Sequence, residues 1–322
     1  MSPLRSIGNA ISAFNDFYAR TAGSASPGAS DPVSATGGVK FTSGDYTYHF
    51  FTSQSPSPFT LSSGNLINVL VVGGGGGAMG DGSGGGGAGG IAHAENMPVS
   101  PGEFTATVGD RGNNSPITNG SGSTFVDPSG PTTITGLGGG AGKDSNPGSN
   151  GGSGGGGGQV NDPGGTGNQP SQNPGLSYVT NYGNDGGPGS GNDEGGGGGG
   201  AGGPGVAAGS GPTSGDGGNG QPFTFMPGPQ LYTDMPSPLQ STLGTAWRDA
   251  LGPTGLMAGG GGGGDDGDHA PYGEPGPGGG GNGGPGSDAV NYTGSGGGGG
   301  SSSPNRAGGQ GGIGLVVVYY PT

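Results

Sequence analysis

Hydrophobic residues gather in a few short runs, and long polar stretches separate them. Five of the runs carry the β-branched and aromatic residues that are typical of strands: Val39–Thr42, Tyr46–Phe51, Leu66–Val72, Phe104–Val108 and Leu315–Tyr320. The third run leads directly into glycines 73–77, and the last follows the glycine cluster at 311–314. We therefore expect these two strands to open and close a glycine-rich region and to bring its ends together on one small sheet.

The first twenty residues follow a different pattern. Apolar residues recur at intervals of 3, 4, 3 and 4, as on one face of a helix that meets a partner: Leu4, Ile7, Ile11, Phe14 and Tyr18. A helix of this length is marginal alone in water. We therefore predict that residues 1–20 form a helix that attaches the protein to a partner. The alternative is a helix folded back on its own domain. Residues 21–38, rich in serine, alanine, proline and glycine, predict a linker.

Glycine dominates the rest of the chain. It supplies 94 of the 322 residues, and only 26% of residues are hydrophobic. A glycine run costs much conformational entropy to order and brings no side chain to bury. This composition argues against a helix bundle or an α/β fold. Collagen is excluded because the stretch Gly80–Gly84 breaks the requirement for glycine at every third position.

Glycine runs can instead adopt the extended helix with three residues per turn, whose backbone groups point outward and can pair with neighbouring rods. We therefore predict a fold that is mostly irregular and β, in which residues 39–322 combine a small β-sheet scaffold with a bundle of polyglycine-II helices that displays loops. The alternative is a flexible glycine-serine linker.

Charge and cysteine content exclude several classes of partner and site. The formal net charge is −14 with seven lysines and arginines, which argues against a nucleic-acid partner. The chain has no cysteine, so neither a disulfide nor a cysteine metal site can form. No apolar stretch approaches the eighteen residues of a membrane span, so we expect no membrane insertion.

The two hydrophobic runs that border the glycine region carry a resemblance. Leu66–Gly77 and Gly311–Tyr320 resemble the bounds of glycine-rich domains in bacteriophage tail-fibre and receptor-binding proteins, and the resemblance covers residues 39–322. In the adhesins of T-even-like phages, a sandwich of polyglycine-II helices presents variable loops that bind a bacterial surface receptor. The insertions at 91–137 and 221–257 and the N-terminal helix depart from that pattern.

The resemblance implies a tail-fibre adhesin on the virion exterior. Its partners would be a carbohydrate or protein of the host cell surface and, through the N-terminal helix, other tail or capsid proteins. The chain would be a homo-oligomer or present in several copies. Two alternatives remain: a structural virion fibre or decoration protein without its own receptor, and a surface-polysaccharide depolymerase.

If consecutive glycine rods run antiparallel, four loops meet at the end far from the sheet: 78–83, 143–150, 265–277 and 301–307. The third loop crowds hard oxygen ligands, an imidazole and an aromatic ring into a few residues: Asp265, Asp266, Asp268, His269 and Tyr272. These groups suit sugar hydroxyls or a calcium ion. The alternative is that the acids are simply solvated turn residues.

A second candidate lies in the insertion at 221–257, which holds Trp247, the only tryptophan. An exposed tryptophan would suit an aromatic anchor for a receptor. The alternative is a small satellite core or a subunit contact. None of His49, His93 and His269 has a G-x-S-x-G motif beside it in the sequence, and we expect neither an enzyme nor a cofactor apart from the calcium candidate.

Overall fold

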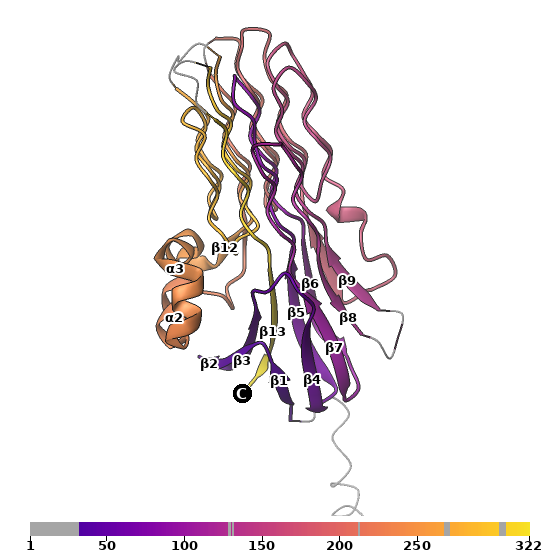
Figure 1. Cartoon of the computed structure of the whole chain (residues 1–322). Helices are drawn as coiled ribbons and strands as arrows, with labels where there is room; N and C mark the ends of the chain where they lie inside the picture. Colours follow the sequence, from indigo (N-terminus) through magenta and orange to yellow (C-terminus); the bar gives the residue numbers. More distant parts are fainter. Residues whose placement is uncertain (1–31, 128–129, 131, 212, 267–270, 303–306) are drawn as a thin grey trace, which may run out of the picture.

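The computed structural model describes residues 32–127, 130, 132–211, 213–266, 271–302 and 307–322. The predicted attachment helix at 1–20 lies outside these residues, as does most of the predicted linker. The described chain is elongated (Figure 1). The described chain begins and ends at the same end of the molecule, where the outer ends of the strands lie. We call this end the base. The opposite end, where the glycine-rich segments turn back, is the tip.

Two antiparallel sheets form the base. The five-stranded sheet has the order β1 (Ser34–Gly37), β4 (Ser57–Ser63), β7 (Gly102–Thr107), β8 (Ser123–Val126) and β9 (Thr133–Gly136). The six-stranded sheet has the order β10 (Val179–Tyr182), β6 (Ile91–Pro98), β5 (Leu66–Val72), β13 (Leu315–Pro321), β3 (Tyr46–Phe51) and β2 (Val39–Ser43). A third, two-stranded sheet pairs β11 (Gln221–Pro222) with β12 (Leu256–Met257).

The two large sheets share a hydrophobic core. Phe59, Phe104 and Phe125 of the five-stranded sheet belong to the same buried cluster as Val69 and Val318 of the six-stranded sheet. Alternate residues along β5 and β13 belong to this cluster, and the residues between them belong to a second cluster on the other face. Both faces of the six-stranded sheet are therefore covered, which explains why β5 and β13 are almost continuously apolar.

The five predicted strands are confirmed, with small shifts at their ends, as β2, β3, β5, β7 and β13. The expectation that the opening and closing strands meet is also confirmed, because β13 pairs with β5 from Leu315 opposite Val72 to Tyr319 opposite Asn68. The sequence analysis missed β1, which lies inside the predicted linker. Its Ala35 is buried and pairs with Leu61 of β4, although serine, threonine and glycine surround it.

The predicted fold class is wrong. We expected a bundle of polyglycine-II helices on a small scaffold, but the regular structure of the described residues consists of three antiparallel sheets, and their α-helices lie toward the C-terminal end of the chain. The glycine runs adopt neither helix nor strand and continue from the strands as extended segments. The composition argument failed because strands such as β4, β6 and β8 add enough buried apolar area for a two-sheet core.

Backbone hydrogen bonds hold these extended segments together. Successive N–H groups of one segment donate to three different neighbours: Gly85 to Gly196 O at 2.9 Å, Gly86 to Gly297 O at 2.8 Å and Gly87 to Gly140 O at 2.8 Å. A side chain would not fit between them. At most buried glycines of these segments, an added Cβ would collide with a carbonyl group of the adjacent segment.

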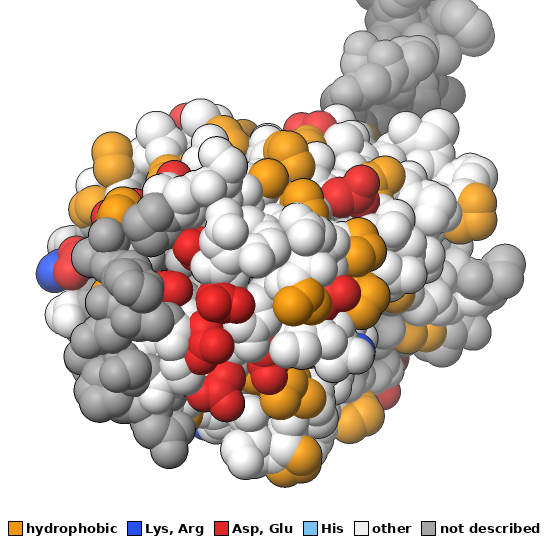
Figure 2. Space-filling model, turned by 90° about the horizontal axis from the view of Figure 1, so that it is seen from above, with side chains coloured by type: hydrophobic (Ala, Val, Ile, Leu, Met, Phe, Trp, Pro, Cys, Tyr) orange, Lys and Arg blue, Asp and Glu red, His pale blue; other side chains and the backbone are white. Residues whose placement is uncertain are grey.

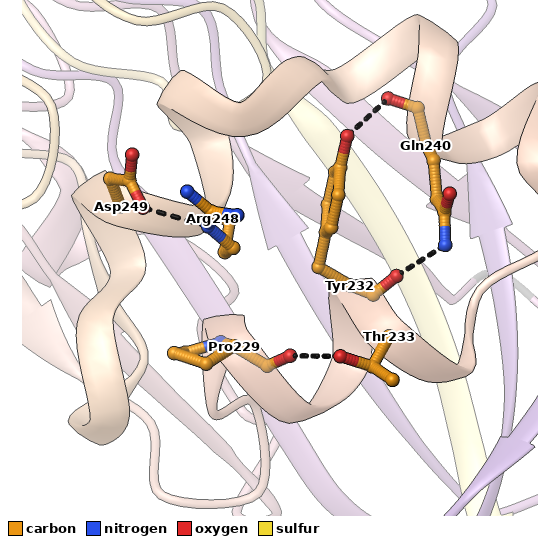
Figure 3. Close-up of polar contacts among 6 residues, drawn as sticks. All are labelled: Pro229, Tyr232, Thr233, Gln240, Arg248 and Asp249. Atoms are coloured by element: carbon orange, nitrogen blue, oxygen red, sulfur yellow. Dashed lines mark hydrogen bonds and ion pairs between the residues drawn. The ribbon is translucent and has the colours of Figure 1, made fainter.

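A helical lobe covers part of the outer face of the six-stranded sheet (Figure 1). It consists of α2 (Gly228–Asp234) and α3 (Ser237–Leu251), and short 3-10 turns occur at Gly252–Thr254 and, elsewhere, at Gln169–Ser171. Figure 3 shows how the two helices are tied, with the Tyr232 hydroxyl donating to Gln240 O at 3.3 Å and Gln240 Nε2 donating to Tyr232 O at 2.7 Å. Within the described residues, no helix has the length and apolar character needed to cross a bilayer.

Two histidines are buried on opposite faces of the six-stranded sheet. The His49 ring nitrogens contact Gly37 O at 2.7 Å and the Tyr320 hydroxyl at 2.9 Å. His93 Nε2 lies 2.8 Å from the Tyr319 hydroxyl. Burial lowers the pKa of both histidines, and this effect exceeds the opposing influence of Gly37 O on His49 and of Glu95 on His93. Both rings are therefore neutral in the folded protein at neutral pH.

Replacing Gly197 by alanine should lower the free energy of unfolding by at least about 2 kcal/mol, because the new methyl group would collide with Asp216 O of the adjacent segment. Gly102→Ala is the matched control, since its methyl group would meet only Ser100 O, at 3.8 Å, and the change should stay within about 0.5 kcal/mol. Denaturant unfolding of both variants measures the difference. Equal stabilities would contradict the close packing of the segments.

Stability should fall as the pH drops below about 6.5, the ordinary histidine value, because the unfolded chain then binds protons that the buried rings do not. Each histidine contributes up to about 1.4 kcal/mol per pH unit. Denaturant unfolding between about pH 5 and 7 tests this, above the range where exposed carboxylates titrate. The slope should become smaller in His93→Phe. An unchanged slope would show that His93 takes up its proton in the folded state.

Candidate functional site

Loops from distant parts of the sequence meet at the tip. Gln159 Nε2 donates to Asp144 Oδ1 at 2.8 Å and to Asp81 O at 3.3 Å, which ties three loops together. Asp266 N donates to Asp193 O at 3.0 Å and joins two more. All four loops that the antiparallel count places at this end are connected there by described contacts, since Ser302 Oγ of the fourth loop donates to Asp266 O. The loops around 159–162 and 189–194 join them.

The backbone of the tip loops adopts left-handed φ angles at residue types that rarely have them. Five residues other than glycine have left-handed φ angles in these loops: Asp81 (56°), Ser145 (37°), Val160 (70°), Asn161 (62°) and Asp193 (79°). Asparagine and aspartate tolerate this region, but a β-branched residue rarely enters it. Val160 is also 59% exposed, so burial does not explain its conformation. Strained backbone of this kind is concentrated at functional sites.

A hollow of about 350 Å³ opens beside Val160. Its walls include Asn161, Ser190, Asn192, Ala208 and Ser210, together with neighbouring glycines. Asn192 is held in place, because its N–H donates to Ser190 Oγ at 3.3 Å and its Nδ2 donates to Ser210 O at 2.9 Å. Ser190 in turn donates to the buried carboxylate of Glu194.

Two other polar side chains of the hollow have no hydrogen-bond partner among the described residues. The Asn161 amide and the Ser210 hydroxyl form no hydrogen bond with any described residue. One carboxylate oxygen of the adjacent Asp162 is buried and also lacks a hydrogen-bond partner among the described residues. Exposed side-chain amides and hydroxyls such as these can donate to and accept from a hydroxyl-rich ligand.

Acidic side chains surround this end of the molecule. Figure 2 looks down on the tip and shows aspartate and glutamate side chains gathered next to hydrophobic ones, with few lysines or arginines. Asp81 and Asp193 are exposed here, and Asp144 and Asp266 are half-buried. The tip therefore presents negative charge and apolar area side by side, and it should repel anionic ligands.

The acidic loop predicted from the sequence begins at the tip, and the structure describes three of its five candidate residues. Asp265 is 1% exposed and forms a β-bridge with Glu194. Asp266 is half-buried, and its carbonyl accepts a bond from Ser302 Oγ. Tyr272 is half-buried, with its ring against Gly284. Asp268 and His269 lie outside the described residues. Among the described residues, no group of three or more histidines and acids is arranged to hold a metal ion.

Trp247, the other candidate, lies in the core. It is fully buried, packs edge-to-face on Phe50 at 6.1 Å and donates from its indole nitrogen to Tyr292 O at 3.1 Å. The aromatic insertion therefore forms the satellite core that we gave as the alternative to an anchor. The predicted attachment residues Leu4, Ile7, Ile11, Phe14 and Tyr18 all lie outside the described residues.

A family model described as a glycine-rich domain matches residues 52–321. The chain belongs to this glycine-rich domain family. No curated protein matches the chain. The match spans β4 to β13, so the glycine-rich domain includes the helical lobe, the tip and all of the sandwich except β1, β2 and β3.

The sequence analysis missed the residues that form the tip hollow. Asn161, Ser190, Asn192 and Ser210 stand among glycines and prolines in stretches that read as simple turns. Their proximity depends on which extended segment pairs with which, and repeated glycines carry no register information. A single polar residue next to an isolated valine, as at Val160–Asn161, is a weak signal in such a chain.

Val160→Gly should stabilise the glycine-rich domain by about 1 kcal/mol, because relief of a left-handed valine outweighs the added backbone entropy of glycine. Val206→Gly is the matched control: this valine is 51% exposed and has no left-handed φ, so the change should be neutral or destabilising by up to about 1 kcal/mol. Chemical denaturation of the two variants provides the measurement. Destabilisation by Val160→Gly would mean that the Val160 conformation is not strained.

Proposed function

We propose that this glycine-rich domain is the adhesin of a phage tail fibre and that its tip binds a receptor on the bacterial surface. The observation that carries the proposal is the convergence of sequence-distant loops at one end of a backbone-paired scaffold, opposite the end where the described chain begins. Binding residues are often found on loops that a rigid scaffold positions. The resemblance of the segments around β5 and β13 to the bounds of phage receptor-binding proteins gives the biological setting.

Recognition is assigned to the tip hollow and the loops around it. The unpaired Asn161 amide and Ser210 hydroxyl supply directional hydrogen bonds, and the exposed Val160 supplies apolar contact. Ser190 and Asn192 hold the geometry through their own hydrogen bonds. A surface carbohydrate or a surface-exposed protein loop would present matching hydroxyl and amide groups. The tip acts by binding, and the proposal assigns it no catalytic step.

The base faces the virion in this proposal. The described chain begins at Pro32 at the base, so residues 1–31 connect to the end opposite the tip. Other tail or capsid proteins would be the partners at this end, and the protein would be present in several copies on the virion exterior. A receptor and a virion partner could then be held at once without competing for surface.

The purified protein should bind cells of a susceptible bacterial strain and reduce phage adsorption to them. Asn161→Ala combined with Ser210→Ala should lower cell binding at least about tenfold, since two directional hydrogen bonds are lost. The matched control is Asn65→Ala, which removes an exposed asparagine at the base and should leave binding unchanged. Neither substituted tip side chain has a described partner, so the cost in stability should come only from the left-handed φ of Asn161, which alanine adopts less readily. Thermal unfolding of the double variant checks that it is folded.

The other readings predict different outcomes of the same experiment. A structural fibre or decoration protein would show no saturable binding to susceptible cells. A depolymerase would release soluble saccharide from capsule or lipopolysaccharide during the incubation. Binding that the tip substitutions leave unchanged would place recognition elsewhere on the molecule.

A further inference from the structure

A second cavity, of about 560 Å³, opens at the base, far from the tip. It lies where the outer ends of β3, β5, β6 and β13 meet the first described residues of the chain. Tyr46, Asn68, Glu95, Asn96 and Tyr319 supply its aromatic and polar lining. The role that we propose for the tip does not involve any of these residues.

A local break in the sheet shapes this cavity. The pairing of β5 with β6 shifts register between Ile67 and Val69, and Asn96 takes a left-handed φ of 51°. Side chains replace the missing ladder bonds, since Asn96 N donates to Asn68 Oδ1 at 2.8 Å and Asn68 Nδ2 donates to Tyr319 O at 3.3 Å. A bulge of this kind re-aims side chains and is common next to binding sites.

The aromatic part of the lining is rigid. The Tyr319 ring stacks on Phe225 at 4.2 Å, and its hydroxyl lies 2.8 Å from His93 Nε2, which restricts its movement. Tyr46 meets Tyr319 edge-to-face at 5.4 Å and is half-buried, so part of its ring remains accessible. Tyr319 is itself buried, so the accessible part of the Tyr46 ring, supported by the fixed Tyr319 ring, is the aromatic surface offered to a ligand.

Glu95 is the charged side chain among the described residues that line the cavity. Glu95 is exposed, and its carboxylate forms neither a hydrogen bond nor an ion pair with any described residue. It lines the cavity together with Tyr319, and its charge adds to the larger effect of burial in raising the pKa of Tyr319. An unpaired carboxylate beside tyrosine rings, in a protein of net charge −14, favours a cation and repels an anion.

We propose that this base cavity receives an arginine side chain of a partner protein. The Glu95 carboxylate matches the forked N–H groups of a guanidinium, the accessible Tyr46 ring suits its flat face, and asparagine side-chain oxygens can take further N–H groups. Lysine fits this lining less well because its ammonium group is a compact point charge that does not stack. The cavity exceeds the volume of one side chain, which leaves room for the neighbouring backbone of the partner.

The test is an NMR titration of the full chain with Nα-acetyl-arginine amide, using the neutral Nα-acetyl-citrulline amide as the matched ligand control. The arginine compound should shift the backbone amides of Asn68, Asn96 and Tyr319 in a saturable manner, with an affinity at least about fivefold above that of citrulline. Glu95→Gln should remove most of this difference. Glu103→Gln changes an exposed glutamate of β7 outside the cavity and should leave it intact.

Several outcomes would overturn the proposal. These are the absence of saturable shifts, equal affinity for citrulline, an unchanged affinity in Glu95→Gln, or shifts spread over the acidic tip. Equal or tighter binding of Nα-acetyl-lysine amide would exclude selectivity for arginine. Thermal unfolding of Glu95→Gln checks that the variant is folded. Cell binding by the tip is measured separately, so failure of either proposal leaves the other standing.

Discussion

The contact of one backbone directly with another is the constraint on which the rest of the molecule depends. In the glycine-rich segments, carbonyl groups occupy the space where a neighbour's Cβ would otherwise lie, as at Gly197 and Asp216. N–H groups of one segment bond to several different segments, so each segment is fixed by its neighbours on more than one side. The loss of conformational entropy at glycine is large. It is opposed by a dense set of paired backbone groups and close backbone contacts, with little help from side chains.

The sandwich and the helical lobe supply the apolar burial that this backbone-paired region lacks. Leu70, Phe50 and Trp247 share one buried cluster on the outer face of the six-stranded sheet, and Phe59 and Phe104 belong to the other cluster, between the sheets. Because β5 leads into the glycine segments and β13 leaves them, the core determines where the first and last segments start. The tip geometry therefore depends on packing at the base.

The sequence predicts strongly patterned features well and pairing-dependent features poorly. Runs such as Leu66–Val72 predict strands because their residue types suit a pleated, buried surface. Strand β1 was not predicted because Ala35 is its main buried residue, and the composition of the surrounding residues is typical of a linker. The polyglycine-II bundle was inferred from composition. Composition alone does not show how much apolar area short strands such as β8 can bury. At the tip, the acidic loop stood out by its charge, whereas Asn161 and Ser210 acquire significance only from neighbours that folding brings to them.

The direction of the strands has a mechanical consequence. Figure 1 shows the strands and the extended glycine segments running along the long axis, between tip and base. Their interstrand hydrogen bonds lie across this axis, since antiparallel ladders bond perpendicular to the strands. A pull applied between the two ends would load the bonds of β5 and β13 in shear, and many bonds would have to break together before a segment could slide. Traction along the axis is thus the direction in which this chain resists extension best.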